Sequence, residues 1–419
     1  MVKFKELHPT TKRLILARAF RSIGQGALVV DLTLYLNSLG WNAFNIGLIL
    51  SLAGLFGALL SLVVGIASDR VRRRPFLIVY EIIVFVCSIT AFLSAQSLVL
   101  SIAIITAGFG RGANGAAGPF SPVEQAWLAE EVPAARRGIV YSLNTAFGFF
   151  GMSLGALLGM LPELLTSWHA QGKTLPDIHA NSFQPIFIIV AAASIVNVFL
   201  ILKARERYST QRRNRAPKKD IKESLIKKQE NKMLTGLVLL NSFNGLAVGF
   251  TGPLISYWFA LRFGVGPASI APILSAAFFI TGISSVLTGN FSDRIGIVKS
   301  VVWARFFGLL LLILLPLVPI FWLASLIYIL RSALNRGSVG ARQALTVGLV
   351  RDERRGLATS LNAVSMQLPQ SIGPSIAGLL FKAGQLELPF YTGALCQGVY
   401  LVLYGLFFRN QNKPGESEE

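Results

Sequence analysis

The sequence is short of charged residues, and acidic residues are the scarcer kind. Only 14% of its 419 residues are Asp, Glu, Lys or Arg, whereas an ordinary globular domain carries roughly 25%. The chain has 20 acidic and 39 basic residues, which gives a formal net charge of +19. Apolar runs of about 20 residues, long enough to cross a bilayer, recur along its whole length. The composition predicts an all-α polytopic membrane protein and excludes a β-barrel, whose strands would be short alternating segments.

Cysteine and histidine are equally scarce. The two cysteines, Cys87 and Cys396, lie inside apolar runs and are expected to pack as small side chains without forming a disulfide. The three histidines, His8, His169 and His179, all fall outside the predicted spans, which argues against a buried metal site. The chain also lacks a phosphate loop, a nucleotide-binding motif and a visible nucleophile–base set. We therefore predict no cofactor, no ATP-driven transport and no enzymatic activity.

The basic residues that are present cluster in alternate loops, with Lys173, Arg262 and Lys382 as the main exceptions. Cytoplasmic loops of membrane proteins carry an excess of Lys and Arg. The alternation therefore predicts twelve spans in the plasma (inner) membrane, with both termini in the cytoplasm. It is a topology signal and not the footprint of a nucleic-acid partner. Because no signal-peptide pattern is visible, the first helix is expected to target the chain to the membrane.

The expected helices divide into two bundles of six. Residues 205–231 hold the densest basic run and predict a cytoplasmic linker between an N-terminal bundle, 1–204, and a C-terminal bundle, 232–419. The linker segment IKESLIKK, 221–228, either forms an amphipathic helix on the anionic inner leaflet or belongs to a solvated connection. The expected helices are 12–38, 43–68, 75–95, 98–129, 137–160, 183–204, 232–262, 267–290, 297–318, 320–350, 356–383 and 387–408.

Two internal repeats link the halves. The motif GIASDRVRRRP at 65–75 returns as GNFSDRIGIVK at 289–299. The stretch QAWLAEEVPAARRGIVYSLN at 125–144 aligns without a gap on QALTVGLVRDERRGLATSLN at 343–362. Self-similarity at matching points indicates duplication. Two duplicated bundles that rock about a shared centre are typical of a secondary transporter.

The loop motif after the second expected helix resembles the signature of the major facilitator superfamily. That signature runs Gly, three residues, Asp-Arg, two residues, and then basic residues. Arg72 stands where the signature has its central glycine, which the second copy retains as Gly296. The matching residues are Gly65, Asp69, Arg70, Arg73 and Arg74.

A second superfamily motif lies in the fourth expected helix, where RGANGAAG at 111–118 matches through Arg111, Asn114, Gly115 and Ala117. The resemblance covers essentially the whole chain. It implies two six-helix bundles related by an approximate axis along the membrane normal, each made of two inverted three-helix repeats. It also implies a monomer that works by alternating access.

One departure concerns the drug/proton antiporters of this superfamily, which usually carry a Gly-Pro pair in the fifth helix. Here the fifth expected helix has no Gly-Pro pair, whereas Gly373-Pro374 falls in the eleventh expected helix. The fifth expected helix instead spaces its glycines for close helix packing. These glycines are Gly148, Gly151, Gly155 and Gly159.

Asp31 is the first candidate for mechanism, because it lies about two-thirds of the way along the first expected helix. A carboxylate at this depth costs about 2.5–3.5 kcal/mol on insertion scales. We predict that Asp31 binds a proton or another coupling ion; a salt bridge with an arginine of a neighbouring helix is the alternative. The resemblance implies a proton-coupling role for Arg111, with a structural pair to Asp31 as its alternative.

A predicted inner gate joins the two halves. Glu124 and Gln125 lie toward the cytoplasmic end of the fourth helix, and the repeat register aligns them with Arg342 and Gln343 in the tenth. Glu124 and Arg342 would pair while the cavity faces outward; snorkelling to the interface is the alternative.

The two copies of the loop motif are predicted to control conformation. In the superfamily the first carboxylate, here Asp69, lies beside the N-terminus of helix eleven, where the helix dipole favours negative charge. Asp293 is its counterpart in the second half. The residues predicted to act with them are Gly65, Arg70, Arg73 and Arg294.

The tenth expected helix is unusually cationic, with Arg331, Arg336 and Arg342, and the ninth adds Arg305. The resemblance implies that the first, fourth, seventh and tenth helices surround a central cavity. Arginines in such a cavity favour carboxylate or phosphate groups; pairing with acidic residues or orientation to the inner surface is the alternative. Uncharged polar residues either line the cavity or join helices by hydrogen bonds. These candidates are Gln25, Asn114, Asn144, Asn241, Asn244, Asn335, Asn362, Gln367 and Gln370.

The leading functional prediction is a proton-coupled exporter of small organic molecules or drugs. The first alternative is an importer or exchanger of an organic anion. A transporter-like receptor or sensor is an alternative of another class. The expected partners are a small-molecule substrate, protons or another coupling ion, and the lipid bilayer.

Overall fold

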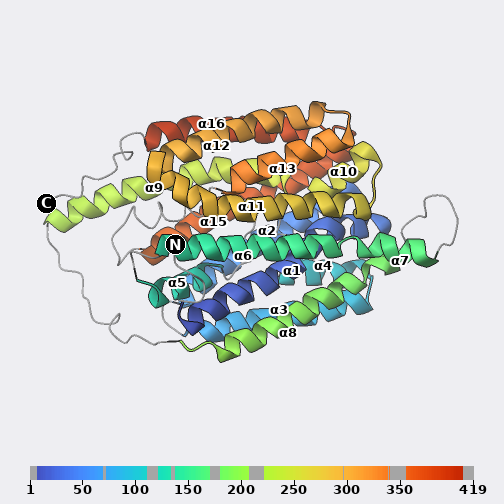
Figure 1. Ribbon diagram of the computed structural model, residues 1–419, viewed down its shortest axis with the longest axis horizontal. Helices are drawn as coiled ribbons and strands as arrows, with labels where there is room; N and C mark the ends of the chain where they lie inside the picture. The colour runs from blue at the N-terminus through green and yellow to red at the C-terminus, as the bar shows by residue number, and fades with distance from the viewer. Residues whose placement is uncertain are drawn as a thin grey trace.

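The computed structural model (Figure 1) describes residues 7–68, 72–110, 121–133, 137–169, 180–206, 221–295, 297–337, 339 and 355–408. Throughout these residues the secondary structure is helical. The N-half contains α1 (Pro9–Ser38), α2 (Ala43–Ser68), α3 (Arg73–Leu93), α4 (Ser97–Ala107), α5 (Ser121–Glu131), α6 (Arg137–Leu158), α7 (Leu161–His169), η4 (Ala180–Phe183) and α8 (Pro185–Lys203). The C-half contains α9 (Ile221–Thr251), α10 (Ile255–Phe263), α11 (Pro267–Ile295), α12 (Ile297–Leu314), η6 (Leu315–Leu317), α13 (Phe321–Gly337), α15 (Arg355–Lys382) and α16 (Leu388–Phe407).

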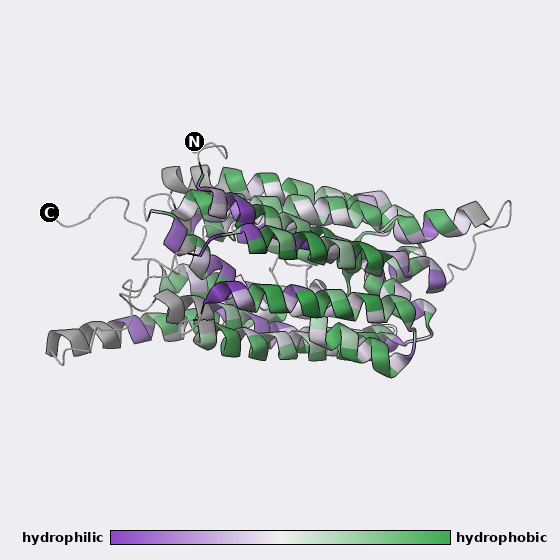
Figure 2. Cartoon of the chain, turned by 90° about the horizontal axis from the view of Figure 1, so that it is seen from below, coloured by the Kyte–Doolittle hydropathy of each residue, from purple (hydrophilic) through white to green (hydrophobic). Residues whose placement is uncertain are grey.

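Each of the twelve expected spans coincides with at least one of these helices. In the described residues, 8 helical stretches are long and apolar enough to cross a membrane. The helix α1 is not among them because it carries Arg18, Arg21 and Asp31 inside its length. Large hydrophobic side chains are exposed along α2, α3, α8, α12 and α16, and Figure 2 shows hydrophobic residues along the length of the bundle. This surface suits contact with lipid tails.

Three expected boundaries were wrong. The fourth span is not continuous, because α4 ends at Ala107. The backbone that follows is left-handed at Gly108 (φ 72°) and Gly110 (φ 78°), a conformation that glycine adopts without strain. Residues 161–169, expected in a loop, form α7 instead. The seventh span divides into α9 and α10, and Pro253, which has no backbone N–H, lies in the break.

Helices α1 and α6 pack through glycines, as their spacing predicts. A Cβ at Gly151 would strike the backbone carbonyl of Ala19, one at Gly155 that of Ile23, and one at Gly26 that of Met152. Small residues allow this close backbone approach, which supplies the van der Waals contact that joins helices in lipid.

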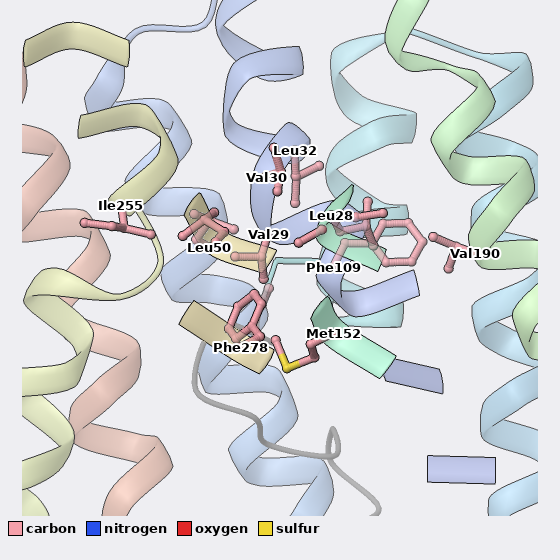
Figure 3. Packing of buried hydrophobic residues seen from close by; sticks show 14 of the residues in the cluster. Leu28, Val29, Val30, Leu32, Leu50, Phe109, Met152, Val190, Ile255 and Phe278 are labelled. Atoms are coloured by element: carbon pink, nitrogen blue, oxygen red, sulfur yellow. The ribbon is translucent and has the colours of Figure 1, made fainter. Parts of the chain in front are cut away.

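The two halves meet along two helix pairs, α2 with α15 and α6 with α11. In the first pair the Cβ position of Gly47 lies against Pro374, and Ser51 Oγ accepts a hydrogen bond of 2.9 Å from Ser375 N. In the second pair the Ser153 and Ser275 hydroxyls lie 2.9 Å apart. Figure 3 shows hydrophobic side chains of α1, α2 and α6 beside Ile255 of α10 and Phe278 of α11. One apolar core therefore continues from the N-half into the C-half.

Further contacts between the halves gather at the end of the bundle that holds the α1–α2 turn, residues 39–42, which we call the distal end. Ser256 Oγ donates to the Val29 carbonyl at 2.7 Å. Tyr257 Oη donates to Asn37 Oδ1 at 3.2 Å. Glu163 of α7 accepts a hydrogen bond of 2.8 Å from Ala268 N, in the first turn of α11, where the helix dipole favours a carboxylate. These contacts hold the halves together at the distal end.

The packing of α1 on α6 can be tested with Gly155→Ala. The added methyl would collide with the Ile23 carbonyl, and we expect overpacking to destabilise the protein by about 1–3 kcal/mol. Thermal unfolding in detergent measures the change. Gly405→Ala is the matched control, since a Cβ there meets nothing within 4 Å. Equal stability of the two variants would contradict close packing at Gly155.

Glu163→Gln tests the distal contact. Loss of the charge beside the α11 dipole removes about 0.3–1 kcal/mol, so the distal-open population should rise about two- to fivefold. Spin labels at Asn45→Cys and Ala383→Cys, both exposed positions in opposite halves, would report this as a longer distance population. Cys87 and Cys396 would first be replaced by serine.

Glu387→Gln is the control for that measurement. Glu387 pairs with Arg262 at 3.6 Å within the C-half, so its loss should leave the distance distribution unchanged. If Glu387→Gln changes the distance distribution as much as Glu163→Gln does, the effect comes from the general loss of a charge and not from the distal contact.

Candidate functional site

A network of buried charges lies inside the N-half. Arg21 of α1 reaches two carboxylates, with Nε 2.6 Å from Glu81 Oε1 and Nη1 2.9 Å from Glu124 Oε2. Arg18 Nη1 lies 3.8 Å from Glu124 Oε1. Asn144 of α6 donates a hydrogen bond of 3.1 Å to the same oxygen. We call these five residues the N-half charge network; all are buried.

The positions of these residues explain how the network forms. Arg18 and Arg21 are three residues apart and so share a face of α1. Glu81 approaches from α3 and Glu124 from the first turn of α5. Two guanidinium groups thus face two carboxylates, and the set carries no net charge. Charges buried in this way are stable only when they are paired and hydrogen-bonded.

The network was only partly foreseen. Glu124 was predicted to pair with Arg342, which lies outside the described residues. Asn144 was predicted either to line the cavity or to join helices by a hydrogen bond, and the structure shows the second. The structure adds Arg18 and Arg21, which the sequence reasoning left out. Their position inside an expected span was the available signal, because arginines in hydrocarbon need partners.

Asp31 is isolated, in contrast to this network. Its side chain is 1% exposed, and neither carboxyl oxygen has a hydrogen-bond partner within the part of the chain that the structure describes. It faces Gly159 just beyond the end of α6, where an added Cβ would lie 2.9 Å from Asp31 Oδ2. Its predicted neighbour, Arg111, is outside the described residues.

The C-half holds buried arginines in a different setting. Arg305 of α12 donates to Asn244 Oδ1 at 2.9 Å, and its Cζ lies 5.3 Å from the Tyr400 ring centre. Arg331 Nη2 donates to Thr251 Oγ1 at 3.2 Å. Arg336 is half-buried, with Cζ 5.5 Å from the ring centre of Phe278. No carboxylate pairs with Arg331 or Arg336 among the described residues.

Several uncharged candidates for the cavity join helices instead. Asn241 donates to Asn362 Oδ1 at 2.9 Å and to Ser365 Oγ at 3.1 Å. Asn335 Oδ1 accepts a hydrogen bond of 3.2 Å from Gln397. Gln367 accepts one of 3.3 Å from Ser61 in the other half. These contacts fit the alternative that the sequence left open, hydrogen bonding between helices.

Gln25 lines a small cavity in the N-half, of about 30 Å³, with Arg21, Tyr80 and Ser194. Its wall includes Gly108 and Gly110, where the chain leaves α4. A volume of this size accommodates one or two water molecules. The cavity is therefore large enough to hold water beside the N-half charge network.

Of the predicted gating residues, Arg73 is the best defined. It is buried and binds Glu130 through two nitrogens, at 2.5 and 3.0 Å. Glu206, at the end of the N-half, accepts hydrogen bonds from the Arg73 and Arg74 backbone nitrogens at 2.9 and 3.2 Å. A carboxylate here is favoured by the N-terminal dipole of α3. The sequence analysis missed both acidic partners, Glu130 and Glu206.

The other predicted gating and coupling residues are less defined. Gln125 donates to Ser121 Oγ at 3.1 Å, within α5. Gly65 lies in α2, and Asp293 and Arg294 lie in α11, but their surroundings are not described. The predicted residues outside the described residues are Asp69, Arg70, Arg111, Asn114, Arg342 and Gln343.

A double-mutant cycle tests the N-half charge network. Arg21→Met leaves Glu81 without its partner and should destabilise the protein by about 3–5 kcal/mol. Adding Glu81→Leu should recover part of the loss, because the uncompensated charge disappears. Thermal unfolding in detergent measures all variants. Strictly additive effects would contradict the pairing.

The matched control for the cycle is Arg262→Met. Arg262 and Glu387 form a more exposed pair, with side chains 29% and 46% exposed, so its loss should cost less than about 1 kcal/mol.

Comparison with known proteins extends over nearly the whole chain. Residues 14–330 and 237–419 match the family model described as Major Facilitator Superfamily. An uncharacterized membrane protein of Saccharomyces cerevisiae, YJR124C, is 21% identical over 434 residues, covering 97% of this chain and 96% of the relative. The multidrug resistance protein MdtG of Citrobacter koseri is 25% identical over 353 residues, covering 82% and 81%.

Among solved structures, a bacterial homologue of the human lysosomal transporter Spinster, in an inward-facing and unoccupied conformation, superposes with a TM-score of 0.67. The two share 15% sequence identity, and the match covers 97% of this chain and 98% of the homologue. At this identity the likeness concerns the fold: two bundles of membrane helices.

Proposed function

Since the chain belongs to the major facilitator superfamily, we propose that it is a proton-coupled secondary transporter that exports small organic molecules by alternating access. Membership of the superfamily makes it a multi-pass membrane transporter of small molecules. Asp31 is the proposed proton site. The substrate would bind between the halves, whose distal contacts would open and close during the cycle.

The observation that carries this proposal is the isolation of Asp31. An ionised carboxylate with no partner is costly to bury, whereas its protonated form removes the charge. Asp31 is 1% exposed and has no hydrogen bond from the described residues. Glu81 and Glu124, by contrast, each lie within hydrogen-bond distance of Arg21. Among the described carboxyl groups with a known environment, Asp31 is therefore the one best suited to gain and lose a proton during transport.

The direction of transport is supported by the relatives and not by geometry. MdtG proteins are named for multidrug resistance, and the chain aligns with more than four-fifths of one of them, though at 25% identity. Resistance of that kind is compatible with export. The basic loops at the opposite end of the bundle support an orientation with the distal end outside the cell, so that its contacts would close the outward path.

The test uses purified protein in sealed liposomes that contain a pH-sensitive dye. Drugs, amino acids, sugars and organic anions are added in turn, and proton movement is followed. At least one class should move protons in the normal protein. In Asp31→Asn this movement should fall to the level of empty liposomes, while downhill substrate flux remains, because asparagine preserves the shape but cannot carry the proton.

Thr33→Val is the matched control. Thr33 is 2% exposed on the same helix, and its hydroxyl also has no partner in the described residues. The change removes a buried polar group at similar depth without removing a titratable one, so proton movement should persist. Active transport that survives in Asp31→Asn would refute the proton site; binding without any flux would favour a sensor.

A further inference from the structure

We infer that Arg331 and Arg336 bind the acid group of an organic anion whose body is aromatic. The binding site itself does not depend on the proposed transport function. Only the statement that such anions are the transported substrates rests on it. We call the two residues the arginine pair. They lie five positions apart on α13, near the middle and the end of the helix. Arg331 is 8% exposed, so nearly all of its guanidinium lies within the protein.

The hydrogen bonding of the arginine pair is incomplete. Arg331 Nη2 donates to Thr251 Oγ1, but Arg331 Nε is buried without a partner in the described residues. Arg336 Nη1 is buried without one as well, while Nη2 reaches Tyr328 Oη at 3.5 Å. A guanidinium has five donors and no acceptor, and its fork matches a carboxylate or a phosphate. Unused donors remain on both members of the pair.

No carboxylate in the described part of the chain compensates the charge of the pair either. Arg331 and Arg336 both lie in the C-terminal half of α13, and the Tyr328 hydroxyl, 3.5 Å from Arg336 Nη2, is a neutral group that carries no compensating charge. Two buried arginines of the N-half, by contrast, are paired with carboxylates: Arg21 contacts Glu81 and Glu124, and Arg73 contacts Glu130. An unpaired buried charge is strongly destabilising, and a bound anion would compensate it.

The surroundings of the pair indicate the rest of the ligand. Arg336 stacks over Phe278, and Phe278 stacks on Phe149 of the N-half at 6.4 Å and 21°. Tyr328 packs edge-on against Phe259 at 5.8 Å. Phe278 therefore lies between the arginine pair and the N-half. Figure 3 shows Phe278 beside α1 and α6. An aromatic body would lie against these rings while its acid group meets the guanidinium groups.

Equilibrium binding to the purified protein in detergent tests this site without requiring proton movement. The probes share one ring system: 2-naphthoate, 2-naphthyl phosphate, the neutral methyl 2-naphthoate and the cationic 2-naphthylmethylammonium. Titration calorimetry measures each dissociation constant. We expect at least one of the two anions to bind, and the neutral and cationic probes to bind at least about tenfold more weakly. The tighter anion identifies the preferred acid group.

The variants Arg331→Gln and Arg336→Gln should each weaken anion binding by about tenfold or more, since each removes a charge-assisted hydrogen bond. Arg331→Lys keeps the charge but loses the fork, so its affinity should be intermediate. The control is Arg262→Gln, an arginine of the same half that pairs with Glu387 at 3.6 Å. It should change the affinity less than about threefold. Gel filtration and thermal unfolding confirm that each variant is folded.

Three results would overturn the inference: no binding of either anion, equal binding of the neutral ester, or equal loss in Arg262→Gln. Because binding is measured apart from flux, a failed proton assay leaves this result intact. Conversely, anion binding can fail while the liposome assay still finds proton-coupled movement of another substrate.

Discussion

Burial of charge without water is the constraint on which the rest of this structure depends. A charged side chain inside the bilayer must be paired, protonated or matched by a ligand. The described residues show three different states. Arg18, Arg21, Glu81 and Glu124 neutralise one another. Asp31 has no partner, and Arg331 and Arg336 have no carboxylate. A charge that the protein leaves uncompensated is the one that a proton or a substrate can compensate.

The architecture could be predicted because its signals are local and repeated. Apolar runs of membrane-spanning length, alternating basic loops and two repeated motifs are each readable along the chain, and the helices occur where these patterns placed them. The close contact of α1 with α6 followed in the same way, because the glycine spacing leaves one face of a helix bare. Breaks within the spans were harder to predict. Gly108 and Gly110, where the fourth span breaks, differ from the glycines that pack helices together in their left-handed backbone conformation, which the sequence does not reveal.

The partners of the charged residues could not be predicted as well. Pairing depends on which faces of different helices meet, and that is a property of the packed bundle. Arg21 joins Glu81 and Glu124, which are 60 and 103 positions away along the chain. The repeat register aligned Glu124 with Arg342, yet symmetry between halves need not mean contact between them. The lack of a partner for Asp31 among the described residues could not be predicted from the sequence either. It depends on which side chains of the neighbouring helices face Asp31 in the packed bundle.

The distribution of strong and weak contacts bears on how such a protein can move. Among the described residues, the tightest ion pairs lie within the N-half, as between Arg21 and Glu81 or Arg73 and Glu130. Contacts between the halves are mostly single hydrogen bonds of neutral groups, such as Ser153 with Ser275 and Ser256 with Val29. A neutral hydrogen bond contributes only about 1 kcal/mol net. If the halves separate, as the proposed mechanism requires, the hydrogen bonds that break are weak ones, and the N-half charge network stays intact.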